Sequence, residues 1–153
     1  MHAVQYNRIE FKVGSTLMHF YDGEELIQEK NFYDIDADAA KNFEIMIFEG
    51  RSFAPVFALM ESGFFYIEGL FFSDTNQSQI KLLKQDDNDL ELILTTGTNE
   101  ALLNGEIIYL EQPIPDTSQT IAAVFPIRFI FETFGCKVDW DNDRRVVIVH
   151  LPQ

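Results

Sequence analysis

The segment from Pro126 to Gly135 limits the possible folds more than any other part of the chain. Proline has a fixed φ and no N–H group, which suits the first position of a helix, and glycine readily adopts the positive φ found just past a helix end. These residues therefore predict a helix of about two to three turns. A helix this short is unstable alone, so strands must cover its apolar face. That face carries four residues at helical spacing: Ile127, Ile130, Phe131 and Phe134.

Much of the remaining chain consists of short apolar or alternating runs separated by glycine and polar turns, which is typical of β-strands. A second short helix is predicted from Pro55 to Ser62, and Gly63 ends it. Asp22-Gly23 predicts a type I′ hairpin. Interrupting aspartates indicate a loop or a single turn between Asn31 and Asn42. The predicted strands cover residues 8–13, 17–21, 25–28, 44–48, 64–72, 79–84, 90–95, 101–103, 107–110, 136–140 and 146–149.

The order of these signals repeats along the chain. The first copy is longer than the second, because it carries an insertion near residues 31–42. We therefore predict an α+β protein of two tandem β-β-α-β-β units, residues 1–86 and 87–153, each an antiparallel sheet wrapped on one short helix. The matching signals are Asp22-Gly23, Pro55, Glu61 and Gly63 in the first unit, and Asn104-Gly105, Pro126, Glu132 and Gly135 in the second.

Composition excludes several classes of protein. The formal charge is −14, from 25 acidic and 11 basic residues, which argues against nucleic acid as a partner because phosphates are bound mainly through Lys and Arg. One cysteine and three scattered histidines give no set of ligands at zinc spacing. No apolar run is long enough to cross a membrane, and we expect no signal peptide in this sequence, because its first residues lack a basic segment followed by an apolar run.

The second unit resembles the copper amine oxidase N-terminal-like domain, also called the stalk domain, over roughly Leu90–Leu151. The similarity weakens over Ile9–Leu83, where Phe57 stands at the position of Arg128 and no tryptophan is present. Three motifs in order carry the resemblance: the Asn104-Gly105 hairpin, the Pro-x-Arg-x-x-x-Glu-x-x-Gly helix of Pro126, Arg128, Glu132 and Gly135, and the Val-x-Trp-Asp strand of Trp140.

This resemblance implies a non-catalytic accessory domain that acts as a spacer or interaction module, often found as tandem repeats in bacterial envelope proteins. The catalytic domain of an amine oxidase needs three copper-binding histidines and a tyrosine that follows an asparagine. Here no tyrosine follows an asparagine, and His2, His19 and His150 lie at unrelated places. We therefore expect neither enzymatic activity nor a cofactor.

Two aspartate-rich segments have features of a calcium-binding loop. Asp139, Asp141 and Asp143 have the spacing that opens an EF-hand loop, but Arg144 and His150 occupy the positions of its glycine and its last glutamate. A solvated turn between two strands is favoured, and no metal site is predicted. Asp34, Asp36 and Asp38 fail the same test, although a loose calcium site there stays open.

Smaller features have structural interpretations. Arg128 and Glu132 are four residues apart and are expected to pair along the helix, with Arg128 also reaching Asp139 or Asp141. Cys136 is expected to be a buried, inert thiol.

The strand predicted at residues 64–72 is apolar on both faces. One face is expected to cover the first unit's own core, and the other to meet the second unit or another subunit. We assign Phe65, Ile67 and Phe71 to the contact face and Phe64, Tyr66, Leu70 and Phe72 to the core face, although the two assignments could be exchanged.

These observations favour a non-catalytic structural or interaction protein with protein partners, and a homo-oligomer fits this role. We expect it to be made in the cytoplasm as a component of a larger bacterial or phage-tail-like assembly. The alternative is a cell-envelope stalk module that binds cell-wall polymer or a protein partner.

Overall fold

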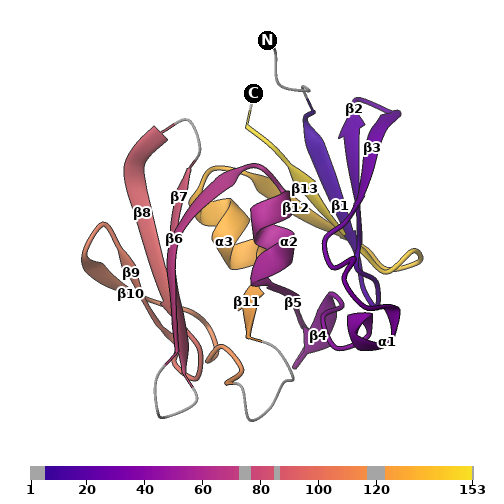
Figure 1. Ribbon diagram of the computed structural model, residues 1–153. Helices are drawn as coiled ribbons and strands as arrows, with labels where there is room; N and C mark the ends of the chain where they lie inside the picture. The colour runs from indigo at the N-terminus through magenta and orange to yellow at the C-terminus, as the bar shows by residue number, and fades with distance from the viewer. Residues whose placement is uncertain (1–5, 73–76, 85–86, 117–122, 153) are drawn as a thin grey trace.

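The computed structural model describes residues 6–72, 77–84, 87–116 and 123–152, and the side chains of residues 37, 69–72 and 87–89 are also outside the described part. Two five-stranded antiparallel sheets lie on either side of a pair of short helices, α2 (Val56–Glu61) and α3 (Ile127–Thr133) (Figure 1). A third, smaller sheet lies at one end of the helices. The protein is therefore mostly antiparallel β-sheet with a few short helices, which agrees with the predicted α+β class.

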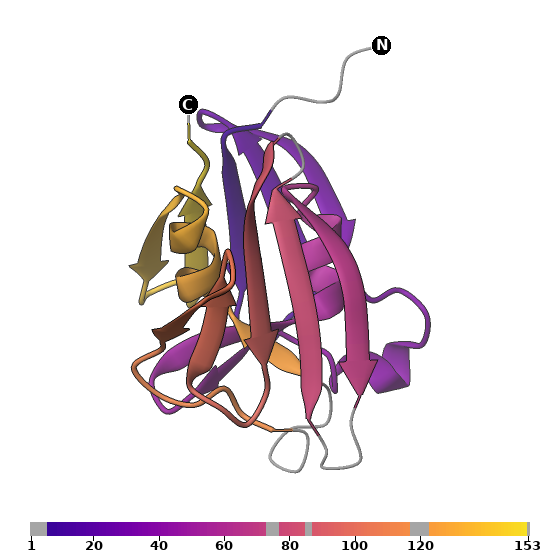
Figure 2. The ribbon, with the colours of Figure 1, turned by 90° about the vertical axis from the view of Figure 1, so that its left-hand side faces the viewer.

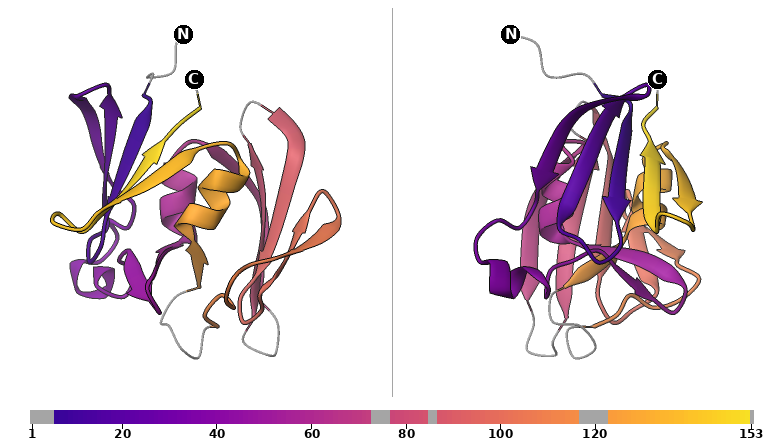
Figure 3. Two further views of the ribbon diagram at one scale, coloured as in Figure 1. Left: turned by 180° about the vertical axis from the view of Figure 1, so that it is seen from behind. Right: turned by 90° about the vertical axis from the view of Figure 1, so that its right-hand side faces the viewer.

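The first sheet joins strands from the two ends of the chain, because β1 pairs with β13 (Figure 3, right). Strand β2 of this sheet alternates buried Met18 and Phe20 with the less buried His19 and Tyr21, as a strand with one face on the core requires. The strand order is β12 (Lys137–Asp141), β13 (Val146–His150), β1 (Arg8–Lys12), β2 (Leu17–Asp22) and β3 (Glu25–Asn31).

The second sheet is a continuous meander in which each strand pairs with the next one along the chain (Figure 2). Its central pair, β7 and β8, joins residues before and after position 86. The strand order is β6 (Phe65–Phe72), β7 (Ser78–Lys84), β8 (Asp87–Thr95), β9 (Glu100–Leu103) and β10 (Glu106–Tyr109).

The third sheet links the starts of the two helices. The strands that lead into α2 and α3 pair antiparallel, with Pro55 opposite Val124 and Phe53 opposite Pro126. Neither of these two strands is predicted from the sequence. The strands of this third sheet are, in order, β11 (Val124–Pro126), β5 (Arg51–Pro55) and β4 (Met46–Phe48). A single helical turn, α1 (Ala37–Ala40), precedes β4.

The buried side chains form one cluster between the two large sheets. Phe131 of α3 is fully buried and contacts Phe11 of the first sheet, with ring centroids 5.9 Å apart, and Phe65 of the second, at 4.9 Å. The same cluster also includes Leu59 of α2 and Ile130 of α3. Both sheets and both central helices therefore share one core.

The helix predictions are confirmed in position, and the turn prediction is partly wrong. Pro126 caps α3 and lies one residue before the helix, and Gly135 follows with a φ of 92°. The two-residue loop between β2 and β3 is Gly23-Glu24, in which only Gly23 has a positive φ, so it is not type I′. Asn104-Gly105 does have two positive φ angles, 51° and 84°.

The predicted arrangement of two units with one sheet each is not confirmed. The structure has three sheets, and each large sheet contains strands from both sides of position 86. Sequence periodicity shows where a strand begins and ends, but it does not show which distant strand it pairs with.

Candidate ligand-binding site

A cavity of about 400 Å³ lies between α3, β12, the β4–β5 turn and the segment that follows β10. Three of the chain's 11 basic residues line it, although the protein carries a net charge of −14. We call it the arginine–tryptophan cavity. The residues that define it here are Arg51, Arg128, Arg145, Trp140, Glu111 and Glu132.

Arg128 projects from the first turn of α3 into this cavity. Its Nε donates to Glu132 Oε2 at 3.1 Å, and its NH2 group donates to the carbonyl oxygen of Val138 at 3.4 Å. The predicted pairing along the helix is therefore confirmed. The further reach of Arg128 is to the backbone of β12, and not to the carboxylates of Asp139 or Asp141.

Trp140 lies on the edge strand β12 with 42% of its surface exposed. Its Nε1 donates to Asn142 Oδ1 at 3.3 Å, which helps to fix the indole ring. The guanidinium carbon of Arg145 lies 5.7 Å from the centre of that ring, within the range of a cation–π contact. This pair forms one wall of the cavity.

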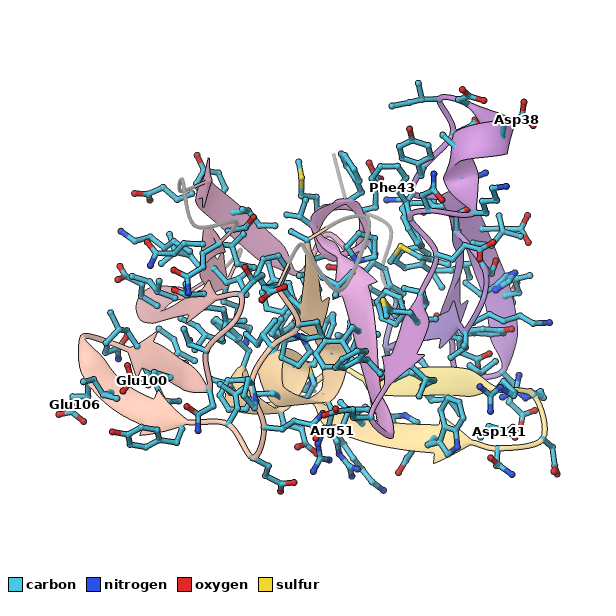
Figure 4. The ribbon with its side chains drawn as sticks, turned by 90° about the horizontal axis from the view of Figure 1, so that it is seen from below. Asp38, Phe43, Arg51, Glu100, Glu106 and Asp141 are labelled. Atoms are coloured by element: carbon cyan, nitrogen blue, oxygen red, sulfur yellow. The ribbon has the colours of Figure 1, made fainter. Side chains whose placement is uncertain are left out.

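A second wall comes from segments far apart in the sequence. The turn Glu49-Gly50 has two positive φ angles and places Arg51 at the start of β5. Arg51 forms an ion pair with Glu111, which follows β10. Figure 4 shows Arg51 at the tip of the β4–β5 hairpin, beside the strands of the β12–β13 hairpin.

The aspartate-rich turn between β12 and β13 is organised by hydrogen bonds within the protein. Asp141 accepts from the backbone N–H groups of Asp143 and Arg144, and from Arg144 Nε at 2.7 Å. The side-chain hydrogen bond from Arg144 lowers the pKa of Asp141 below its usual value. Arg144 also pairs with Glu10 of β1 at 3.0 Å. This geometry matches the predicted turn between strands.

Six of the seven residues assigned to the two faces of the apolar strand fall on β6, and Phe64 lies directly before it and is buried. Phe65 is buried against Phe131 and Phe134 of the α3 region, with ring centroids 4.9 and 5.0 Å apart. Ile67 is partly buried against the same core, whereas Tyr66 is 56% exposed, so for Phe65, Tyr66 and Ile67 the two predicted faces are exchanged. The side chain of Phe71 lies outside the described part of the chain. Whether this strand contacts a partner stays a prediction.

Cys136 follows the glycine that ends α3 and is buried. Burial raises the pKa of its thiol to about 12, although nearby Lys84 partly opposes this shift. The thiolate is therefore scarce at neutral pH, as the sequence indicated.

The sequence singles out, as structural motif residues, side chains that lie on one side of the cavity, but it predicts no binding site there and gives no indication of the other side. Four of the motif residues line the cavity, namely Pro126, Arg128, Glu132 and Trp140, whereas Gly135 and the Asn104-Gly105 hairpin do not. Arg51 and Glu111 are 60 residues apart, and no pattern connects them. The one available signal was the presence of arginines in turns of a strongly acidic chain.

Two further features concern metals and membranes. Within the described residues, no group of three or more His, Cys, Asp and Glu side chains is placed to hold a metal ion. None of the helices in that part of the chain has the length and apolar character needed to cross a bilayer.

Comparison with known proteins gives one match. The model of the copper amine oxidase N-terminal domain family matches residues 38–149 as a single span, from α1 to β13. Neither the curated proteins nor the solved structures give a significant match. The family match covers more than half of the chain and includes every motif on which the resemblance rests. The chain therefore belongs to the copper amine oxidase N-terminal domain family.

Proposed function

We propose that this chain is a non-catalytic interaction protein that holds a partner at the arginine–tryptophan cavity. The observation that carries this proposal is the exposure of two residues from the family motifs. The side chain of Arg128 is 67% exposed and Trp140 is 42% exposed, so neither is needed to fill the core. Exposed aromatic and arginine side chains that line a cavity are well suited to binding.

The charged groups of the cavity fit binding better than covalent chemistry. Arg128 is paired with Glu132, and Arg51 with Glu111. Such pairs can orient a ligand, whereas covalent catalysis requires a nucleophile activated by an adjacent base.

Two settings suit an interaction protein of this kind. In the first, the chain is a component of a larger bacterial or phage-tail-like assembly and contacts other proteins. In the second, it is a cell-envelope module that binds cell-wall polymer or a protein. The mixture of donors and acceptors in the cavity favours a polar ligand and therefore supports the second setting.

A protein contact at strand β10 is a second candidate. This strand is at an edge of the second sheet, and its alternate residues Ile107 and Tyr109 are 56% and 65% exposed. An edge strand with exposed apolar side chains can pair with a strand of another chain, including a second copy.

An array that displays glycans and peptides would test both candidates with the labelled wild-type protein and two variants, Trp140→Ala and Ile107→Lys. We expect the bound features to be lost with Trp140→Ala and kept with Ile107→Lys. The reverse result would assign the contact to β10. Features that both variants still bind would contradict both proposals, provided that melting curves show that the variants are folded.

A further inference from the structure

The Trp140–Arg145 pair is positioned by the turn that carries it. Arg145 has a φ of 56°, a left-handed conformation that most residues avoid, and its carbonyl accepts a hydrogen bond from the Val13 N–H at 3.0 Å. The backbone of the turn is therefore held by Val13, which directly follows β1, and the guanidinium lies over the indole ring.

Arg145 differs from the other two arginines of the cavity. Arg51 and Arg128 are paired with Glu111 and Glu132, whereas within the described part of the chain the guanidinium of Arg145 forms no ion pair. Its positive charge is available to an anionic group of a ligand, next to the aromatic ring.

The paired groups restrict the ligand further. Each arginine–glutamate pair presents N–H donors beside carboxylate acceptors, so the best ligand both donates and accepts hydrogen bonds. A ligand that is anionic throughout would face the carboxylates of Glu111, Glu132 and Asp139. A wholly apolar ligand would cover these polar groups without satisfying them.

From this chemistry we propose that the arginine–tryptophan cavity binds an acidic saccharide. One face of a sugar ring lies against Trp140, the carboxylate of the sugar pairs with Arg145, and the hydroxyl groups exchange hydrogen bonds with the Arg128–Glu132 and Arg51–Glu111 pairs. This proposal rests on the interaction role proposed above and names the class of ligand that the cavity takes.

Trp140 is the single tryptophan of the chain, so its fluorescence reports binding at the cavity directly. The titration uses three probes: an oligogalacturonate, a neutral galactose oligomer of equal length, and a short polyglutamate peptide. We expect a saturable change with the oligogalacturonate and at least tenfold weaker binding of the other two.

A variant tests the part of the site that recognises the carboxylate. Arg145→Gln should weaken oligogalacturonate binding about tenfold or more in calorimetry, because a charge-assisted hydrogen bond is lost. It should leave binding of the neutral oligomer little changed. Lys41→Gln is the matched control, because it removes the same charge from an exposed residue that does not line the cavity, and it should bind like the wild type.

The outcomes separate this proposal from the proposed function. Equal binding of the neutral oligomer, equal binding of polyglutamate, or no effect of Arg145→Gln would overturn the acidic saccharide while leaving an interaction role intact. No binding of any probe would overturn it as well. Mass spectrometry of the saccharide after incubation should show it unchanged, and cleavage would contradict the non-catalytic role instead.

Discussion

The two central helices are alike on their inner faces and different on their outer faces. Each follows a proline at the end of a short paired strand, and a glycine with positive φ follows each, with φ 71° at Gly63 and 92° at Gly135. Their inward residues, such as Leu59 and Ile130, are fully buried in the shared core.

The outer faces diverge at one corresponding position, the second residue of each helix. In α2 this residue is Phe57, which lies against Tyr33 and Phe43, two rings that stack 4.2 Å apart. In α3 it is Arg128, which lines the open cavity. Figure 4 shows Phe43 near α1, at the side of the molecule away from Arg51. The inner face of such a helix is constrained by the core, while the outer face is free to be covered or to bind.

The largest effect is expected when the chain is divided between the two halves. Fragments 1–86 and 87–153 should each be unfolded alone and should regain the sheet signal in circular dichroism when mixed, because each large sheet needs strands from both. Cooperative unfolding of fragment 87–153 alone would instead establish the second half as an independent domain.

The likeness of the inner faces predicts equal losses for Leu59→Ala and Ile130→Ala. Each should lower the free energy of unfolding by about 2–5 kcal/mol, because both residues are fully buried. Urea denaturation gives the values. Met60→Ala is the control, since Met60 is 54% exposed, and it should cost about 1 kcal/mol or less. A loss at one site only would show that the two helices do not contribute alike.

The difference between the outer faces predicts smaller losses of stability than in the core, and unequal losses for the two helices. Phe43→Ala should cost about 1–3 kcal/mol, because it removes stacking and burial around Phe57. Trp140→Ala should cost about 1 kcal/mol or less, since it removes an exposed cation–π contact, an exposed hydrogen bond to Asn142 and partial packing. If the tryptophan variant is the less stable of the two, Trp140 serves folding more than binding.

Local signals in the sequence predicted most elements of the fold. The helix after Pro126, its four buried residues and the hairpin at Asn104-Gly105 depend on neighbours a few positions apart, and the structure has all of them. The strands that end at Pro55 and Pro126 were missed, because each leads directly into a helix and exists by pairing with the other strand far along the chain.

The candidate site was only half predictable for the same reason. Arg128, Glu132 and Trp140 lie in one segment with recognisable spacing, so their motif was visible. Arg51 and Glu111 reach the cavity only because β4, β5 and the end of β10 are brought to α3 by long-range pairing. No periodic pattern in the sequence predicts a contact between segments so far apart.

The pairing of β1 with β13 also determines where the two ends of the fold lie relative to each other. Leu151 donates a backbone hydrogen bond to Asn7 at 2.9 Å, so the chain enters and leaves the fold at one point. If copies of such a fold were joined in series, each copy would add little to the end-to-end length of the chain, because its two ends lie side by side. Each copy would project to the side of the connecting chain, with its cavity facing the surroundings.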